Sequence, residues 1–386
     1  MLIIGFISGN VFDLNLNEKL SSTFRSIALV IILLRAGLGL DPNVIKKLSG
    51  ICIRLSLIPC IGEAFTISVV TYLLMDLPFV WGILLGFILS GVSSAIVIPD
   101  MIVLQEEQLG TNKGIPTLLM ASASVDNVVA ITGFGVCLSF VFDNNSSLVW
   151  NIFKAPVTVV AGIVGGVVFG LILWLIPIKC CPQEEQQNDF KLLRLCLLLL
   201  IGMFLVFVSK KVGFDGSGPL GCLIFSFITS LKWRSSPFYE QLRNYLCYLW
   251  LIFEVSLFVL IGSEVKISDL NNSSIGFAVI SLFIGLLMRS IITVMVTFGA
   301  NFKYKEKLFI TLSWIPKATV QAAIGPIALD LARDRNDLQL INYAKLVLTL
   351  AVLSIIITAP LGSIGISLSA KKCLQYAKRL DYSTEI

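Results

Sequence analysis

The segment "WIPKATVQAAIGP", residues 314–326, interrupts a hydrophobic span with two prolines and one charge. Pro316 and Pro326 bracket the segment, and Lys317 directly follows the first proline. Proline lacks the backbone N–H and breaks a helix, and a broken helix is tolerated inside a membrane where it is buried in protein or lines a cavity. The segment therefore predicts a discontinuous membrane helix with a polar site beside the break.

A second interrupted span covers residues 79–104. It contains Pro99, and small residues recur at every fourth position: Gly82, Gly86, Ser90 and Ser94. This spacing lets a neighbouring helix approach closely. Two interrupted spans at corresponding positions of two halves are the best sequence pointer to the binding site of an inverted-repeat transporter. Two proline-kinked helices without a common role are the alternative.

The composition is that of a polytopic membrane protein. Of the 386 residues, 56% are hydrophobic and 14% are charged, whereas a soluble domain carries roughly 25% charged residues. About 20 apolar residues cross the hydrocarbon core as a helix, so the sequence predicts an all-α fold with eleven full spans and one short one. The predicted spans are 1–12 (short), 24–40, 51–74, 79–104, 115–142, 155–177, 192–208, 213–231, 240–263, 275–299, 308–331 and 346–369.

The two interrupted spans are the middle members of two triplets of spans. The first triplet covers residues 51–142 and the second covers residues 275–369. Seven steps along the chain relate the interrupted spans, and an odd number of steps inverts the orientation. This is the relation that an inverted repeat requires.

Lysine and arginine are distributed unevenly between the two sets of alternating loops. The set that includes residues 41–50 and the C-terminal tail holds 16 of them, and the other set holds 8. Cytoplasmic loops carry the excess of positive charge, so both termini are predicted to be cytoplasmic. The glycosylation sequons at 144–147 and 271–274 fall in the other set, in agreement with this orientation. The membrane is expected to be the plasma membrane or that of an organelle.

The chain has no histidine and no phosphate-binding loop of the Walker type. The missing histidine removes the usual metal ligand and the usual pH switch, so protonation near neutral pH must use carboxylates. Without a phosphate loop, transport is expected to be secondary rather than driven by ATP. The net charge of +5 is modest, and we expect neither a nucleic-acid partner, nor a cofactor, nor enzyme activity.

Four ionisable residues lie deep within the predicted spans: Glu63, Asp126, Arg289 and Lys317. A charged residue at a helix centre costs roughly 2.5–3.5 kcal/mol on insertion scales, so such residues are functional candidates. Glu63 and Arg289 lie on the matching first helices of the two triplets, which predicts one ion pair and leaves Asp126 and Lys317 for a second pair. A carboxylate beside an ammonium can exchange a cation for a proton, because both ions compete for the same oxygens. Cohesion between helices is the alternative role for both pairs.

Four segments resemble the NHA branch of the sodium/proton antiporters, within the monovalent cation:proton antiporter superfamily. They are "SIALVIILLRAGLGLD" (26–41), "RLSLIPCIGEA" (54–64), "GIPTLLMASASVDNVVAITGF" (114–134) and "WIPKATVQAAIGPIALDLAR" (314–333). The resemblance covers nearly the whole chain. It implies an NhaA-like inverted-repeat fold in which two broken helices cross, and in which elevator-like alternating access exchanges Na⁺ or Li⁺ for H⁺ in pH homeostasis.

The resemblance also implies a homodimer in the lipid bilayer, with one exchanger domain covering residues 1–386. The core would be formed by spans of about 51–142 and 275–369, and the dimerisation or linker spans would be about 1–40 and 155–263. The family's first N-terminal span and part of its second are expected to be missing from this chain.

Residue by residue, Asp126 matches the first acid of the family's Asp-Asp motif and Lys317 matches its lysine partner. Glu63 and Arg289 match the family's second buried pair. Asn127 occupies the place of the second aspartate, which in the family binds the cation and carries protons. Asparagine offers a neutral carbonyl oxygen and does not titrate.

Ser93 and Ser94 fall in the break of the first crossing helix, where the family pattern usually reads Ser-Pro. The leading hypothesis is a monovalent cation/proton antiporter with weakened coupling. Asp126 would be the only titratable acid at the site, Lys317 would balance its charge, and Na⁺ or Li⁺ would bind near Asp126 and Asn127. The expected neutral oxygens come from Asn127, Ser93, Ser94 and Thr319. The alternatives are a transport-inactive paralogue, an incomplete gene product, a cation channel, or an interaction protein that transports nothing.

Overall fold

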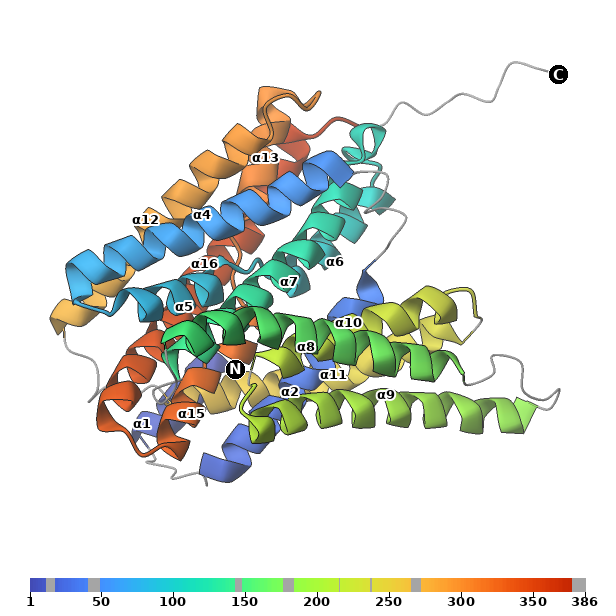
Figure 1. The fold of residues 1–386 in the computed structure, drawn as a ribbon. Coiled ribbons are helices and arrows are strands. Elements are labelled where there is room, and N and C mark those ends of the chain that lie inside the picture. The colour runs from blue at the N-terminus through green and yellow to red at the C-terminus, as the bar shows by residue number, and fades with distance from the viewer. Residues whose placement is uncertain are drawn as a thin grey trace, which may run out of the picture.

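The computed structural model describes residues 1–11, 18–40, 49–142, 148–175, 184–214, 216–236, 238–264 and 272–376 (Figure 1). This part of the chain is helical apart from its connections and one isolated β-bridge. Nine of the described helices are long and apolar enough to cross a membrane. The predicted all-α polytopic fold is therefore confirmed. The first sequon and Asn271 of the second lie outside the described residues.

In chain order, the described helices have the following bounds. They are α1 (Leu2–Val11), α2 (Glu18–Gly39), α4 (Ser49–Met75), α5 (Phe79–Ser90), α6 (Ser94–Glu106), the 3₁₀ turn η1 (Thr111–Lys113), α7 (Ile115–Val141), α8 (Leu148–Trp174), α9 (Glu184–Val212), α10 (Ser217–Trp233), α11 (Tyr239–Glu264), α12 (Asn272–Val296), α13 (Tyr304–Ser313), α14 (Thr319–Ile324), α15 (Ile327–Asp334) and α16 (Leu338–Cys373).

Each of the twelve predicted spans contains a helix or a broken series of helices. The nine long helices account for nine spans, with α5 and α6 counted together as one. The short first span holds α1, with 10 residues, and another span holds α10, with 17 residues. Both are shorter than the roughly 20 residues that a perpendicular crossing needs. The remaining span is the interrupted series α13, α14 and α15.

Both predicted interruptions are present, but the first one lies earlier in the chain than its proline suggests. The helix stops after Ser90 and resumes at Ser94, whereas Pro99 lies inside α6. In the second interruption, α13 ends at Ser313 and α14 begins at Thr319. A proline inside a membrane helix is tolerated where neighbouring groups satisfy the freed carbonyl, so the extended residues 91–93 make the break.

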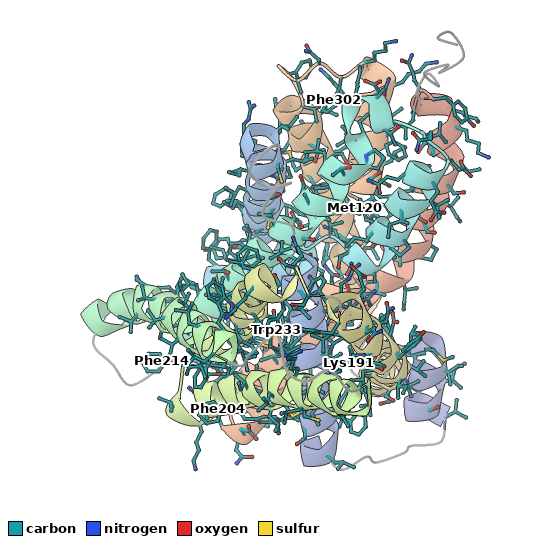
Figure 2. All side chains as sticks on the ribbon, turned by 90° about the vertical axis from the view of Figure 1, so that its right-hand side faces the viewer. Met120, Lys191, Phe204, Phe214, Trp233 and Phe302 are labelled. Atoms are coloured by element: carbon teal, nitrogen blue, oxygen red, sulfur yellow. The ribbon has the colours of Figure 1, made fainter. Side chains whose placement is uncertain are left out.

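The helices form two groups that lie side by side (Figure 1). The first group contains α4 to α7 and α12 to α16, and the second contains α1, α2 and α8 to α11. Figure 2 shows Met120 and Phe302 in the first group and Phe204 and Trp233 in the second. Helices α7 and α14 of the first group contact α8, α10, α2 and α11 of the second. The two interruptions both belong to the first group.

The small residues of the first interrupted span bring α5 into close contact with α4. A Cβ atom added to Gly82 would lie 2.9 Å from Ser68 Cα, and one added to Gly86 would lie 2.3 Å from the Ala64 carbonyl oxygen. One turn further, Ser90 Oγ lies 3.2 Å from the Sγ atom of Cys60. The close helix approach predicted from the four-residue spacing is confirmed, and it sets α5 against the helix that carries Glu63.

Loops that the predicted topology places on one side of the membrane contact one another. Lys113 Nζ donates to the Asn301 carbonyl at 2.8 Å and to Glu306 Oε2, in the first turn of α13, at 2.7 Å, which joins η1 to the loop after α12. The amide of Gly110 donates to the Gln375 carbonyl at 2.8 Å, which joins the loop after α6 to the end of α16. These contacts fit the predicted alternation of loops.

A charge cluster joins the two helix groups at the end of the molecule opposite these loop contacts. Arg25 of α2 forms ion pairs with Glu264 of α11, at 3.1 Å, and with Asp330 of α15. Arg333 of α15 donates to the second oxygen of Glu264 at 2.9 Å. The side chain of Arg25 is 3% exposed, so this cluster ties α15 to the second helix group with largely buried charges.

Candidate functional site

The two interrupted helices cross at their breaks. The backbone amide of Ser93, between α5 and α6, donates to the carbonyl of Pro316, between α13 and α14, at 2.8 Å. A Cβ atom added to Gly91 would lie 2.9 Å from Val320 Cγ1. A broken helix leaves backbone groups without helical partners, and each break here supplies a partner to the other.

The carbonyl at the end of α5 attracts two basic side chains from the second triplet. The carbonyl oxygen of Ser90 accepts from Arg289 Nη1 at 2.6 Å and from Lys317 Nζ at 3.2 Å. The C-terminal end of a helix carries partial negative charge. The fold therefore places the Arg289 guanidinium and the Lys317 ammonium at the C-terminal end of α5, which stabilises their positive charges.

The four intramembrane charges form one continuous chain of contacts. Lys317 Nζ lies 2.8 Å from Glu63 Oε2, and Arg289 Nη1 lies 2.6 Å from the same oxygen. Arg289 Nη2 lies 2.9 Å from Asp126 Oδ1. All four side chains are at most 1% exposed. Buried charges persist when they are paired and hydrogen-bonded, and each of these charges has an opposite partner.

The pairing differs from the one expected for Asp126 and Lys317. The ammonium of Lys317 contacts Glu63, and the carboxylate of Asp126 contacts Arg289. The planar guanidinium presents several donors in a fork, so Arg289 spans both acids, which a point charge does not. The second oxygen of Asp126 accepts from the Val92 amide at 2.9 Å, so both of its oxygens are occupied.

Two consequences follow for the charge of the site. Glu63 belongs to the same cluster, so the expectation that Asp126 is the only acid there was wrong. Two acids and two bases give a formal charge of zero when all four are ionised, and Asn127 adds no charge.

Among the described residues, there is no group of three or more His, Cys, Asp or Glu side chains that could hold a metal ion.

Three of the expected neutral oxygens are buried without a hydrogen-bond partner among the described residues. They are Asn127 Oδ1, Ser93 Oγ and Thr319 Oγ1. Asn127 follows Asp126 on α7, Ser93 directly precedes α6, and Thr319 begins α14. Ser94 is the first residue of α6 and is half-buried. An unpaired buried acceptor costs free energy unless something binds it, so these oxygens are candidate ligands.

Sequence reasoning missed Gln321, which bonds the end of α5 through its amide nitrogen. Its signal was present in the opening segment, because a glutamine between valine and alanine in an apolar helix requires a polar partner. The backbone amide of Val92, which binds Asp126, carries no signal in the sequence. Backbone partners depend on where the break falls.

A solved membrane antiporter has this fold, in which two broken helices cross over a buried charge cluster. The chain matches the solved sodium proton antiporter MjNhaP1 from Methanocaldococcus jannaschii, determined at pH 8, with a TM-score of 0.75. The match covers 96% of this chain and 91% of that chain at 19% sequence identity. The likeness establishes the fold, and the predicted NhaA-like antiporter architecture is confirmed.

Sequence comparison identifies the family. Residues 1–372 match the family model described as sodium/hydrogen exchanger, transmembrane. Sodium/hydrogen exchanger 9B2 from Homo sapiens is 42% identical over 390 residues, covering 100% of this chain and 71% of the relative. The 9B2 protein from Xenopus tropicalis is 42% identical over 379 residues, covering 97% and 69%. Sodium/hydrogen exchanger 9B1 from Homo sapiens is 40% identical over 378 residues, covering 97% and 72%.

The chain belongs to the transmembrane sodium/hydrogen exchanger family. The predicted resemblance is confirmed, and the family is one of transporters rather than of enzymes.

Proposed function

We propose that the protein is a secondary active antiporter that exchanges a monovalent cation, Na⁺ or Li⁺, for a proton by alternating access. Its family and the names of its relatives, which are sodium/hydrogen exchangers, support this activity. The observation that carries the proposal is the crossing itself. A charge-balanced buried cluster adjoins three buried oxygens that have no hydrogen-bond partner among the described residues.

The cation is proposed to bind near Asp126 and Asn127. Oxygen atoms replace the hydration shell of a monovalent cation in a membrane protein, and Asn127 Oδ1, Ser93 Oγ and Thr319 Oγ1 supply such atoms. Asp126 shares its carboxylate with Arg289 and with a backbone amide. The cation must therefore share Asp126 with these donors or displace one of them, which weakens its binding.

The neutral cluster gives a physical reason for exchange. A bound cation adds one positive charge to a buried site whose four charges already cancel, and an uncompensated charge there is costly. In the fully ionised cluster neither carboxylate holds a proton, so the proton whose loss restores neutrality leaves Lys317, the proposed charge-compensating group. Cation binding and proton release therefore favour each other, and a one-for-one exchange moves no net charge.

The two helix groups are proposed to have separate roles. The core spans, about 51–142 and 275–369, would carry the site, and the spans at about 1–40 and 155–263 would form the dimerisation and linker part of a homodimer. Crossing of the two breaks within the first helix group supports this division. Both termini are proposed to be cytoplasmic, in the plasma membrane or an organelle membrane.

Purified protein in proteoliposomes with a trapped pH dye tests the site. An imposed Na⁺ or Li⁺ gradient should change the internal pH with the wild type, and Asp126→Asn should reduce the rate at least tenfold. Arg243→Gln, which removes an exposed charge from a surface pair, serves as the control and should leave the rate unchanged. Full activity of Asp126→Asn would remove Asp126 from the mechanism. An inactive wild type would favour the reading as a transport-inactive paralogue.

A further inference from the structure

Gln321 is a buried glutamine at the crossing, and the nitrogen and the oxygen of its side-chain amide have different surroundings. It lies in α14 and is 0% exposed. Its Nε2 atom donates to the carbonyl of Ile88 at 2.9 Å and to the carbonyl of Gly91 at 2.8 Å. One side chain of the second broken helix thus bonds the last turn of α5 and the residue that follows it.

These carbonyls require donors because α5 ends there. The last carbonyls of a helix have no helical N–H partner, and inside a membrane water does not replace it. Ser90 O receives Arg289 and Lys317, and Phe87 O accepts from the Ser90 hydroxyl at 3.1 Å. Gln321 supplies the donor for Ile88 and Gly91, and its Nε2 atom also lies 3.5 Å from the carbonyl of Leu89.

The same bonds fix the orientation of the amide. Both acceptors are backbone carbonyls, which only accept, so the amide nitrogen of Gln321 must face them. The Oε1 atom then points the other way. It is buried and has no hydrogen-bond partner among the described residues. A buried amide oxygen in this condition is the type of atom that a cation or a water binds.

Gln321 lies on the same helix as Thr319 and bonds the same break that holds Ser93, and both residues are proposed cation ligands. Thr319, two residues earlier in α14, has an unpartnered buried hydroxyl, as does Ser93. The amide of Ser93 bonds Pro316, just before α14, and Val320 contacts Gly91. Gln321 therefore belongs to the segment that brings these oxygens to the crossing.

We propose that Gln321 is a cation-binding residue: Nε2 anchors α14 to the end of α5, and Oε1 coordinates the monovalent cation. The inference rests on the proposed antiport but concerns binding, which is measured separately. The amide oxygen adds a neutral ligand, of the kind that carbonyl groups provide in cation pathways. It adds no charge to the balanced cluster, which suits a site that binds and releases its ion.

The test uses the full-length chain and two readouts. Equilibrium binding of radiolabelled Na⁺ to detergent-purified protein gives the affinity, and Na⁺-driven pH change in proteoliposomes gives KM and the maximal rate. Gln321→Met removes both amide atoms at similar volume. Gln105→Met is the matched control, because Gln105 is partly buried and donates to Thr117 Oγ1 at 2.9 Å, outside the crossing. Gln321→Asn keeps the amide and serves if the methionine variant does not fold.

Gln321→Met and Gln321→Asn should each weaken Na⁺ binding and raise KM by about tenfold or more, with Gln105→Met like the wild type. A tenfold change corresponds to about 1.4 kcal/mol. Unchanged Na⁺ affinity in folded Gln321→Met would overturn the proposal while leaving antiport intact. A wild type that binds Na⁺ but exchanges nothing would refute the antiport, and weaker binding by Gln321→Met would still support the inference. A wild type that binds neither Na⁺ nor Li⁺ would overturn both.

Discussion

Arg289 lies against Asp126, with Nη2 2.9 Å from Oδ1, and this contact makes one cluster out of what the sequence presents as two ion pairs. The other arm of the same guanidinium contacts Glu63, which in turn holds Lys317. Each of the other three charges is thereby linked, directly or through other residues, to Asp126. A substitution of any of the four residues is therefore expected to change cation binding at the proposed site.

Removing Arg289 should be strongly destabilising. Arg289→Met leaves Asp126 without its ion-pair partner and Glu63 with Lys317 alone, and breaking a buried pair costs about 3–5 kcal/mol. The measurement is the free energy of unfolding of the purified protein in detergent. Arg243→Met is the control, because its pair with Glu240 is exposed at 47% and 71% and should contribute about 1 kcal/mol or less. Equal effects of the two variants would contradict the cluster.

The coupling inside the cluster can be measured by a double-mutant cycle. Arg289→Met and Asp126→Asn should each destabilise the protein, but the double variant should be less destabilised than the sum. Residues in contact show interaction energies of roughly 0.5–3 kcal/mol. Additive effects on the unfolding free energy would show that the two side chains act independently.

The charge cluster between the helix groups should also stabilise the fold. Arg25→Met leaves Glu264 and Asp330 without their shared partner, and Arg333 still contacts Glu264. We expect a loss of about 3 kcal/mol, at the lower end for a broken buried pair, because the acids are 13% and 10% exposed. Denaturant unfolding of the variant checks this value, and a change below about 0.5 kcal/mol would argue against the cluster.

The contact between α4 and α5 predicts a strict limit on side-chain size. Gly86→Ala places a Cβ atom 2.3 Å from the Ala64 carbonyl oxygen, and overpacking costs about 1–3 kcal/mol. Gly365→Ala is the control, since a Cβ atom there meets nothing within 4 Å. Thermal unfolding should separate the two variants clearly. If Gly86→Ala were as stable as Gly365→Ala, the helices would not be packed as described.

Asn127→Asp should tighten cation binding. The added carboxylate gives the neutral cluster one negative charge, which a monovalent cation compensates. The apparent KM for Na⁺ in proteoliposomes should fall by about tenfold, the factor that corresponds to roughly 1.4 kcal/mol. Asn112→Asp, in the 3₁₀ turn η1, is the control for charge alone. An unchanged KM for Asn127→Asp would show that residue 127 does not contribute to cation binding.

Much of the fold could be predicted because membrane chemistry is strict. Charges such as Glu63 and Lys317 stand out in apolar spans, since their cost restricts them to special positions. The four-residue spacing of Gly82 and Gly86 predicted a close helix contact, which the structure confirms.

Pro99 alone did not locate the first break, because a membrane helix tolerates proline once its neighbours satisfy the backbone. The family resemblance placed the break at Ser93 and Ser94, and in the structure α6 begins at Ser94.

The pairing inside the site could not be predicted from helix order alone. Asp126 binds Arg289 and the Val92 amide. The Val92 amide is available as a partner because the helix is broken at that position. The guanidinium of Arg289 spans two acids, a geometry that counting charges does not show. Gln321 could be recognised as a polar residue in an apolar segment. Its partners could not be predicted, because they are backbone carbonyls and every residue has one.

The central claim, one-for-one exchange of a cation for a proton, is tested by wild-type proteoliposomes that carry a trapped pH dye and a voltage-sensitive dye. An imposed Na⁺ gradient should change the internal pH while the membrane voltage stays constant, because a neutral cluster exchanges one charge for another. A voltage change without a change of pH would show a cation channel and contradict the account.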